Sequence, residues 1–267
     1  MTAIAVIGHV TLDSVAGAAP RPGGAVFYSG RALARIGADA RVGASCARGE
    51  WALLLPHLED FRLPVAWYES ATTTAYSFRY EGERRIMRQD AVGEPWSAAQ
   101  SLDAVKDARW IHVGALVRTD FPEETLAALA RDGRRLLVDA QGLVRTPDLG
   151  PLRTDGDIGD VLRHVHILKL SDEEAETLVG SAEPEALAGL GPAEVLLTLG
   201  SQGAYVIADG EVAHVPAREI AGPVEPTGAG DTFSAAYLTA RAAGSDPVGA
   251  AERATAAVAN FLSVPRT

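Results

Sequence analysis

The amino-acid sequence predicts an α/β fold of three layers, in which a mainly parallel sheet lies between two layers of helices. The first observation is that short, almost wholly apolar runs recur along the chain, as in strands that are buried on both faces of a parallel sheet. The second is that segments of helical period alternate with these runs, as in repeated βα units. The third is size, because 267 residues with 47% hydrophobic content can bury one large core. We therefore expect a single domain over residues 1–267.

The individual elements follow from periodicity. Expected strands are the apolar or β-rich runs at residues 3–8, 41–46, 65–68, 73–80, 84–89, 110–116, 135–139, 166–170, 195–199 and 204–208. Expected helices lie at residues 25–36, 51–58, 97–106 and 122–131, then from Ser171, from the turn at 228–231 through Ala243, and over 248–262.

Turn residues and caps justify several boundaries. Gly8 ends the first strand, and Gly23-Gly24 precede a helix whose small residues favour close packing. Glu81-Gly82-Glu83 turns the chain between two β-rich segments and predicts a hairpin. Ser171-x-x-Glu174 is a complete capping box at a helix start.

Composition excludes several function classes. A formal net charge of −11 argues against broad binding to nucleic acid or to anionic membranes, both of which rely on basic surfaces. No apolar run reaches the roughly 18 residues of a membrane span, and the N-terminus lacks a secretory pattern, so we expect a cytoplasmic protein. Cys46 is the only cysteine, which excludes an intrachain disulfide and predicts a small buried side chain. The six histidines, at positions 9, 57, 112, 164, 166 and 214, show no paired spacing for a metal.

One stretch, from Glu225 to Ser234, concentrates the chemistry. Gly228-Ala229-Gly230 leave the backbone unshielded where a helical segment begins, so successive N–H groups could converge on a phosphate. Asp231 falls in or next to the first helical turn, where it could accept a proton from a hydroxyl held against the same anion. The structural alternative is a tight turn with Thr227 as a cap and Asp231 favoured by the helix dipole. We predict that Gly228, Ala229, Gly230 and Asp231 are catalytic.

These ten residues resemble the second signature of the ribokinase-like (PfkB-type) carbohydrate kinases. Pro22-Gly23-Gly24, followed by the segment 32–37, resembles the first signature, and Thr198-Leu199-Gly200 falls in the expected order. Asp139-Ala140-Gln141-Gly142-Leu143-Val144-Arg145 is similar to the Asp-x-Gln-Gly-x-x-Arg stretch of the inositol-kinase-like members. The resemblance spans nearly the whole chain. It implies a ribokinase-like three-layer fold with a small β lid, formed by parts of about 64–90, that covers the acceptor and excludes water.

The resemblance also implies an ATP-dependent kinase that transfers the γ-phosphoryl group to a hydroxyl of a small polyol or sugar. Asp231 would be the general base; an ordinary aspartate pKa of roughly 3.9 would leave it ionised at neutral pH, so it would need positioning more than tuning. The implied substrate-binding residues are Asp13, Gly23, Gly24, Tyr28, Gln141 and Arg145. The implied nucleotide-binding residues are Lys169, Thr198, Gly200, Gly203 and Thr255. Glu174 would organise Mg²⁺ through water, or serve only in the capping box.

Three departures from the family pattern shape the predicted acceptor. Tyr28 stands where many relatives have Asn, Ser171 also replaces an Asn, and Glu225 replaces an Asp. A ring at position 28 narrows the pocket and offers one hydroxyl in place of an amide, so an inositol or aminocyclitol is favoured over ribose.

The alternatives are a nucleoside kinase and a catalytically silent sugar-binding protein. A homodimer is an open possibility. Candidate lid contacts are Thr72, Thr73, Thr74, Arg79, Arg84, Arg85 and Arg88.

Overall fold

The main sheet of the computed structural model confirms the predicted three-layer α/β architecture. The structure describes residues 3–15, 19–81, 84–220, 222 and 224–263. The strand order is β14-β13-β12-β11-β9-β8-β1-β4-β5, and every neighbouring pair from β12 to β5 is parallel, whereas β13 and β14 add an antiparallel edge. Their bounds are β1 (Ile4–His9), β4 (Ala40–Ala47), β5 (Val65–Ser70), β8 (Trp110–Gly114), β9 (Arg135–Asp139), β11 (Ile167–Ser171), β12 (Glu194–Thr198), β13 (Ala204–Ala208) and β14 (Glu211–Val215).

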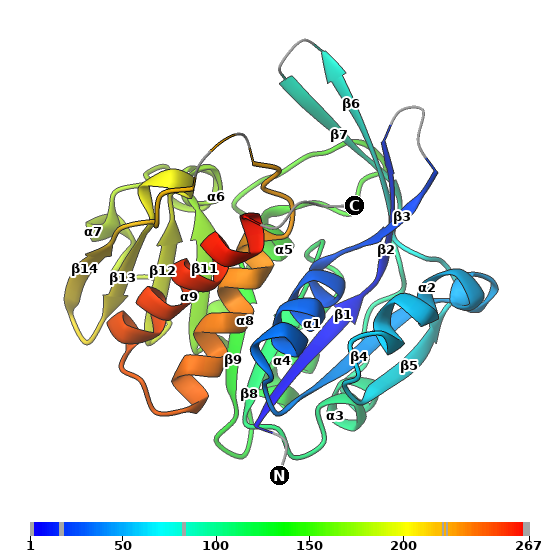
Figure 1. Cartoon of the computed structure of the whole chain (residues 1–267), viewed down its shortest axis with the longest axis horizontal. Coiled ribbons are helices and arrows are strands. Elements are labelled where there is room, and N and C mark those ends of the chain that lie inside the picture. Colours follow the sequence, from blue (N-terminus) through cyan, green and yellow to red (C-terminus); the bar gives the residue numbers. More distant parts are fainter. Residues whose placement is uncertain (1–2, 16–18, 82–83, 221, 223, 264–267) are drawn as a thin grey trace.

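Helices cover both faces of this sheet (Figure 1). One layer holds α1 (Ala25–Ile36), α2 (Trp51–Glu59), α8 (Ala229–Ala242) and α9 (Pro247–Leu262). The other holds α3 (Ala98–Val105), α4 (Glu123–Leu129), α6 (Asp172–Val179), α7 (Pro184–Leu187) and the short α5 (Gln141–Val144). Short 3₁₀ turns lie at Arg48–Glu50, Val161–His164 and Gly200–Gln202.

Alternating side chains of each strand enter the two cores. In β1, Ile4 and Val6 pack on the layer of α1 and α8, whereas Ala5 and Ile7 pack on the layer of α3 and α4. All four are fully or almost fully buried. Successive side chains point to opposite faces of the sheet, and both faces are covered by helices. All side chains of the strand are therefore buried, which explains the continuous apolar runs of the sequence.

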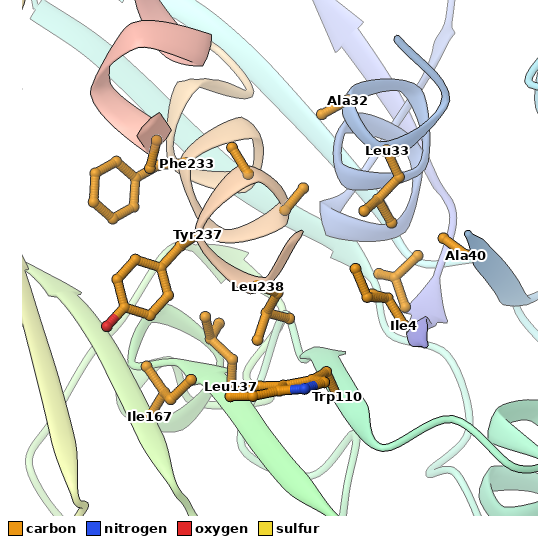
Figure 2. Packing of buried hydrophobic residues seen from close by; sticks show 14 of the residues in the cluster. Ile4, Ala32, Leu33, Ala40, Trp110, Leu137, Ile167, Phe233, Tyr237 and Leu238 are labelled. Carbon is orange, nitrogen blue, oxygen red and sulfur yellow. The ribbon is translucent and has the colours of Figure 1, made fainter. Parts of the chain in front are cut away.

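Helix α8 is fixed along the sheet by large buried side chains. Tyr237 and Leu238 project from it toward Leu137 and Ile167 of the sheet, as Figure 2 shows, and the ring of Phe233 stacks on that of Tyr237. Burial of each such side chain contributes about 1.5–3 kcal/mol. The packing therefore holds the first turn of α8 close to the carboxyl end of β11, where α/β folds bind ligands.

A second, small sheet rises above one edge of the main sheet (Figure 1). Its strands, in the order β10-β7-β6-β2-β3, are β10 (Gly150–Pro151), β7 (Arg84–Ala91), β6 (Ala75–Glu81), β2 (Thr11–Val15) and β3 (Arg21–Gly23). The predicted hairpin is confirmed, since β6 pairs antiparallel with β7.

Not all strands within the stretch of about 64–90 enter the lid, and residues 65–68 are the part that does not. These residues belong to β5, which pairs in parallel with β4 at the edge of the main sheet. Strands β2, β3 and β10 take the remaining places in the small sheet, and they come from distant parts of the chain. Such long-range pairing leaves no local signal in the sequence.

Within the part of the chain that the structure describes, no helix is long and apolar enough to cross a membrane.

Candidate active site

The first turn of α8 has the backbone geometry that its sequence predicts. Gly228 is the N-cap residue with φ 83°, in the left-handed region that favours glycine. The N–H of Ala229 donates to the carbonyl of Pro226 at 2.9 Å, so it closes the turn and is not aimed at a ligand. The N–H groups of Gly230 and Asp231 follow it at positions where a helix has no internal acceptor. In this geometry the N–H groups that remain for an anion start at Gly230, and the catalytic role of the turn stays a prediction.

Neighbouring side chains explain why positions 228 and 230 of this turn are occupied by glycine. A Cβ on Gly228 would lie 2.4 Å from Cδ1 of Tyr28, so the Tyr28 ring packs directly on the turn. A Cβ on Gly230 would lie 2.9 Å from Nζ of Lys169. The turn is thus held between a ring from α1 and an ammonium group from β11.

Two cavities flank this turn. The smaller, of about 180 Å³, is lined by Thr11, Asp13, Gly24, Ala25, Tyr28, Tyr76, Met87, Leu116, Gln141, Arg145, Thr227, Gly228 and Asp231. We call it the acid-lined cavity. The larger, of about 620 Å³, is lined by Thr198, Gly200, Ser201, Gly203, Ala217, Arg218, Glu219, Ile220, Gly222, Val224, Pro226, Ala229, Gly230, Phe233, Thr255, Val258, Ala259 and Leu262. We call it the apolar cavity. Consecutive residues of one helical turn thus line both cavities. The two cavities therefore adjoin each other at Gly230 and Asp231.

The acid-lined cavity gathers most of the predicted substrate residues. Asp13 lies on β2 and accepts a hydrogen bond from the Thr11 hydroxyl at 2.8 Å. A Cβ on Gly23 would lie 2.2 Å from Oδ2 of Asp13, so glycine allows β3 to approach this carboxylate. Nη2 of Arg145 donates to Oε1 of Gln141 at 2.8 Å, and this bond orients both side chains.

A buried ion pair lies behind the anion turn. Nζ of Lys169 is 2.7 Å from Oδ2 of Asp139, and both side chains are 8% exposed. Although burial opposes it, the carboxylates of Asp139, Glu174 and Asp231 raise the pKa of Lys169. Lys169 is therefore a cation beside Gly230 at neutral pH. It was predicted as a nucleotide contact, but it is not among the residues that line the apolar cavity.

The expectation of an ordinary pKa for Asp231 is wrong. Burial raises the pKa of Asp231 to about 7, and the nearby Asp139 carboxylate adds to the shift, whereas Lys169 and Arg145 oppose it. At neutral pH the base form and the acid form are therefore comparably populated. A raised pKa makes the carboxylate a stronger base, as in other tuned catalytic acids and bases.

This pKa predicts an acid limb in the activity. If Asp231 must be ionised to accept a proton, kcat/KM should fall about tenfold per pH unit below about 7 and level off above it. The measurement is a pH profile at fixed free Mg²⁺ and saturating donor. The residual activity of Asp231→Asn should show no such limb. A limb centred near pH 4 would show that the site does not tune this carboxyl.

Glu174 forms the predicted capping box. Oε2 of Glu174 accepts from the Ser171 N–H at 2.8 Å, and the Glu174 N–H donates to the Ser171 hydroxyl at 3.3 Å. Burial, and then the Asp139 charge, raise the pKa of Glu174. Its metal role stays a prediction.

The remaining predicted residues divide between the cavities and the scaffold. Thr198, Gly200, Gly203 and Thr255 all line the apolar cavity, as the nucleotide prediction requires. Glu225 accepts from the Thr227 N–H at 3.0 Å and so supports the turn.

The predicted lid contacts whose side chains the structure describes do not line the acid-lined cavity. Thr73 binds Glu50 and the Ala47 N–H, Thr74 accepts from the Gly93 N–H, Thr72 is exposed, and the exposed Arg88 side chain lies near Asp90. The side chains of Arg79, Arg84 and Arg85 lie outside the described residues.

Sequence reasoning missed several walls of the cavities. Tyr76 and Met87 reach the acid-lined cavity from β6 and β7. Val258, Ala259 and Leu262 line the apolar cavity from α9, beside the predicted Thr255. They follow Thr255 at i+3, i+4 and i+7, which marks one face of a helix and could have identified them.

The fold and this glycine-rich turn between two cavities define the class of ribokinase-like α/β proteins. The chain matches the model of the pfkB family carbohydrate kinases over residues 10–263. It is 26% identical, with a TM-score of 0.85 and coverage of 98% of this chain and 96% of the other, to a pyrophosphate-dependent kinase in the ribokinase family complexed with a pyrophosphate analogue and myo-inositol. The chain belongs to the pfkB family of carbohydrate kinases, as the sequence motifs predicted.

Two curated relatives are sugar kinases. The ribokinase of Bacillus subtilis is 27% identical over 187 residues, which are 70% of this chain and 60% of the length of that relative. The fructokinase of Rhizobium leguminosarum bv. trifolii is 28% identical over 245 residues, which are 83% of this chain and 72% of the relative.

Proposed function

We propose that the chain, as a single kinase domain, transfers the γ-phosphoryl group of ATP to a hydroxyl of a small single-ring polyol or sugar, with an inositol or aminocyclitol preferred. The observation that carries this proposal is the pair of cavities that meet at the first turn of α8. A donor in the apolar cavity and an acceptor in the acid-lined cavity would face each other across Gly230 and Asp231. Phosphoryl transfer needs a donor and an acceptor that face each other in line, and two cavities that adjoin one turn meet that need.

The size and lining of the acid-lined cavity support a small polyol acceptor. Its volume of about 180 Å³ lies below the roughly 300–1,000 Å³ typical of sites for drug-sized ligands, which favours one ring over a nucleoside. Asp13, Gln141 and Arg145 offer acceptors and donors for several hydroxyl groups. Arg145 is the only cation among the described lining residues and already binds Gln141, so a phosphorylated acceptor is disfavoured. The similarity to a structure complexed with myo-inositol points in the same direction.

The apolar cavity supports a nucleotide as the donor. Val224, Phe233, Val258 and Leu262 offer a surface that a nucleobase can cover and that pyrophosphate cannot. Pyrophosphate is the competing donor, because the similar kinase is pyrophosphate-dependent.

The residues present are compatible with Mg²⁺ held mainly by the donor phosphates. The Asp139 carboxylate acts on both Glu174 and Asp231, and these three acidic side chains outnumber the cations Lys169 and Arg145 that also act on them. No group of three metal-binding side chains exists among the described residues, so water and phosphate would supply most of the coordination. Bound Mg²⁺ would neutralise phosphate charge.

The roles of the side chains follow from their places. Asp231 accepts the proton of the acceptor hydroxyl, the N–H groups at the start of α8 bind the transferring group, and Lys169 supplies positive charge behind them. Asp13 orients the acceptor. The proposal includes a cytoplasmic location and a homodimer.

A panel of donors and acceptors tests the proposal. We expect kcat/KM to be highest for ATP with an inositol or aminocyclitol, and lower for ribose and nucleosides, because missing hydrogen bonds reduce transition-state binding. A tenfold lead for ribose or a nucleoside, equivalent to about 1.4 kcal/mol, would contradict the cyclitol preference. A tenfold lead for pyrophosphate would contradict ATP. Binding of a polyol without turnover of any donor would identify a silent sugar-binding protein.

Glu174→Gln separates the two roles of this side chain. Glutamine keeps an acceptor for the capping box but removes the charge, so the melting temperature should change little. A metal role predicts that the Mg²⁺ concentration for half-maximal rate increases several-fold. Identical Mg²⁺ titrations for both proteins would leave only the cap.

A further inference from the structure

Helix α1 connects the two halves of the proposed site. Its first turn, with Gly24 as the N-cap and Ala25 as the first residue, lines the acid-lined cavity. One turn later Tyr28 packs on Gly228, and Ser29 lies next to it on the same helix. Helices α1 and α8 pack side by side (Figure 1).

Ser29 makes a connection from α1 to the residue that carries the base. Oγ of Ser29 donates to the backbone carbonyl of Asp231 at 3.1 Å and lies 3.0 Å from Nδ1 of His112 on β8. Ser29 is 0% exposed and His112 is 1% exposed. Water therefore cannot replace either partner, and loss of one would leave a buried polar group unsatisfied.

Both contacts of Ser29 are hydrogen bonds in only one arrangement of the hydrogens. A carbonyl oxygen only accepts, so the single hydrogen of the Ser29 hydroxyl goes to Asp231. Nδ1 of His112 must then donate to the Ser29 oxygen, which requires the neutral tautomer with hydrogen on Nδ1. Burial lowers the pKa of His112 to about 4, so this ring is neutral near pH 7. Nε2 of His112 is buried and without a partner among the described residues, as suits the nitrogen that lacks the hydrogen.

We propose that Ser29, oriented by His112, is a positioning residue that fixes the first turn of α8 and thereby aims the Asp231 carboxylate at the acceptor. The connection runs from the sheet through α1 to α8, and α1 also carries the start of the acceptor cavity. Acceptor and base thus share one rigid support. This inference rests on the proposed role of Asp231 as general base.

The kinetic test compares Ser29→Ala with Ser101→Ala. Ser101 is also a fully buried serine, on α3, and its hydroxyl has no partner among the described residues, so it controls for the loss of a buried hydroxyl. We expect Ser29→Ala to lower kcat at least tenfold while both KM values stay within about threefold. Ser101→Ala should keep kcat within about twofold. A kcat for Ser29→Ala within twofold of wild type would overturn the proposal.

The pH profile separates positioning from mere structural support. A loosened first turn of α8 admits water to Asp231, so the acid limb of Ser29→Ala should move below that of the wild type. Asp13, Asp139, Arg145 and Lys169 still act on Asp231 in this variant. A reduced kcat with an unmoved limb would show that Ser29 acts only on the fold.

Histidine variants and NMR test the proposed direction of the bonds. His112→Asn keeps an N–H donor near the position of Nδ1, so it should retain several-fold more activity than His112→Leu; equal losses would overturn the role of the donor. Nitrogen-15 shifts of His112 should show hydrogen on Nδ1 in the intact protein, and hydrogen on Nε2 would equally refute it. The NMR measurement does not depend on turnover. If the wild type phosphorylates no acceptor, the proposed function fails, whereas the hydrogen-bond connection can still be judged.

Discussion

Asp231→Asn should lower kcat by about 100-fold or more, the lower range for loss of a general base, while the protein stays folded and still binds nucleotide. Asparagine has nearly the same shape and keeps a hydrogen-bonding side chain at the start of α8, but it cannot take a proton from the acceptor. The apolar cavity is lined by Ala229 and Gly230 rather than by Asp231, so the donor Kd should change little. Single-turnover phosphoryl transfer and nucleotide titration give the two quantities.

The same substitution should stabilise the protein at alkaline pH. Because the pKa of Asp231 is about 7 in the folded protein and about 3.9 when unfolded, the folded state binds more protons between these values. The wild type therefore loses stability as pH rises from about 4 to about 7, and the loss remains above pH 7. Asp231→Asn lacks this titration, so its melting temperature should exceed that of the wild type at pH 8.

Asp172→Asn is the matched control for Asp231→Asn. Asp172 also lies in the first turn of a helix, α6, but it is exposed and lines neither cavity. Its removal should change stability by less than about 1 kcal/mol, the size of a helix-dipole effect, and leave kcat unchanged. Near-normal turnover of a clean Asp231→Asn preparation would remove Asp231 from the mechanism.

Lys169→Met should cause a comparably large loss of activity together with a large loss of stability. The substitution leaves the buried Asp139 carboxylate without its cation, and breaking a buried ion pair costs about 3–5 kcal/mol of unfolding free energy. It also removes positive charge beside Gly230, where loss of one stabilising group typically lowers kcat by roughly 10²–10³. Chemical denaturation and steady-state kinetics measure the two losses.

A pH shift distinguishes loss of the Lys169 charge from general damage. Lys169 lowers the pKa of Asp231, so in Lys169→Met the acid limb of kcat/KM should move to higher pH than in the wild type. Lys106→Met is the control, because Lys106 pairs with Asp103 at the surface and exposed pairs contribute about 0–1 kcal/mol. A Lys169→Met protein with wild-type stability and an unmoved limb would refute both the ion pair and its action on the base.

The sequence by itself determined the layered fold and the chemistry of the central turn. The continuous apolar runs predicted strands with helices on both faces, because the alternation of apolar and polar residues disappears when both sides of a strand are buried. Gly228-Ala229-Gly230-Asp231 predicted a helix start with exposed N–H groups and an acid, because glycine readily adopts a positive φ such as the 83° of Gly228. The capping box of Ser171 and Glu174 was also predictable, because its hydrogen bonds join residues that are close in the sequence.

Only the tertiary structure decided the composition of the small sheet. Strands β2, β3 and β10 come from distant parts of the chain and pair with β6 and β7. Strand β5, which precedes β6 in the sequence, belongs to the main sheet instead. Strand pairing over long separations depends on which surfaces remain open after the core has formed. A β-rich segment alone therefore does not show which sheet it enters.

The tertiary structure also decided the electrostatics of the site. The pKa of Asp231 is set by burial and by charges on Asp139, Lys169 and Arg145, which come from other elements of the chain. Likewise, the position of Lys169 behind Gly230 and the contact of Ser29 with Asp231 arise where separate helices and strands meet. Burial and charge act through space and fall steeply with distance, so the sequence could name the base but could not give its proton affinity or its supports.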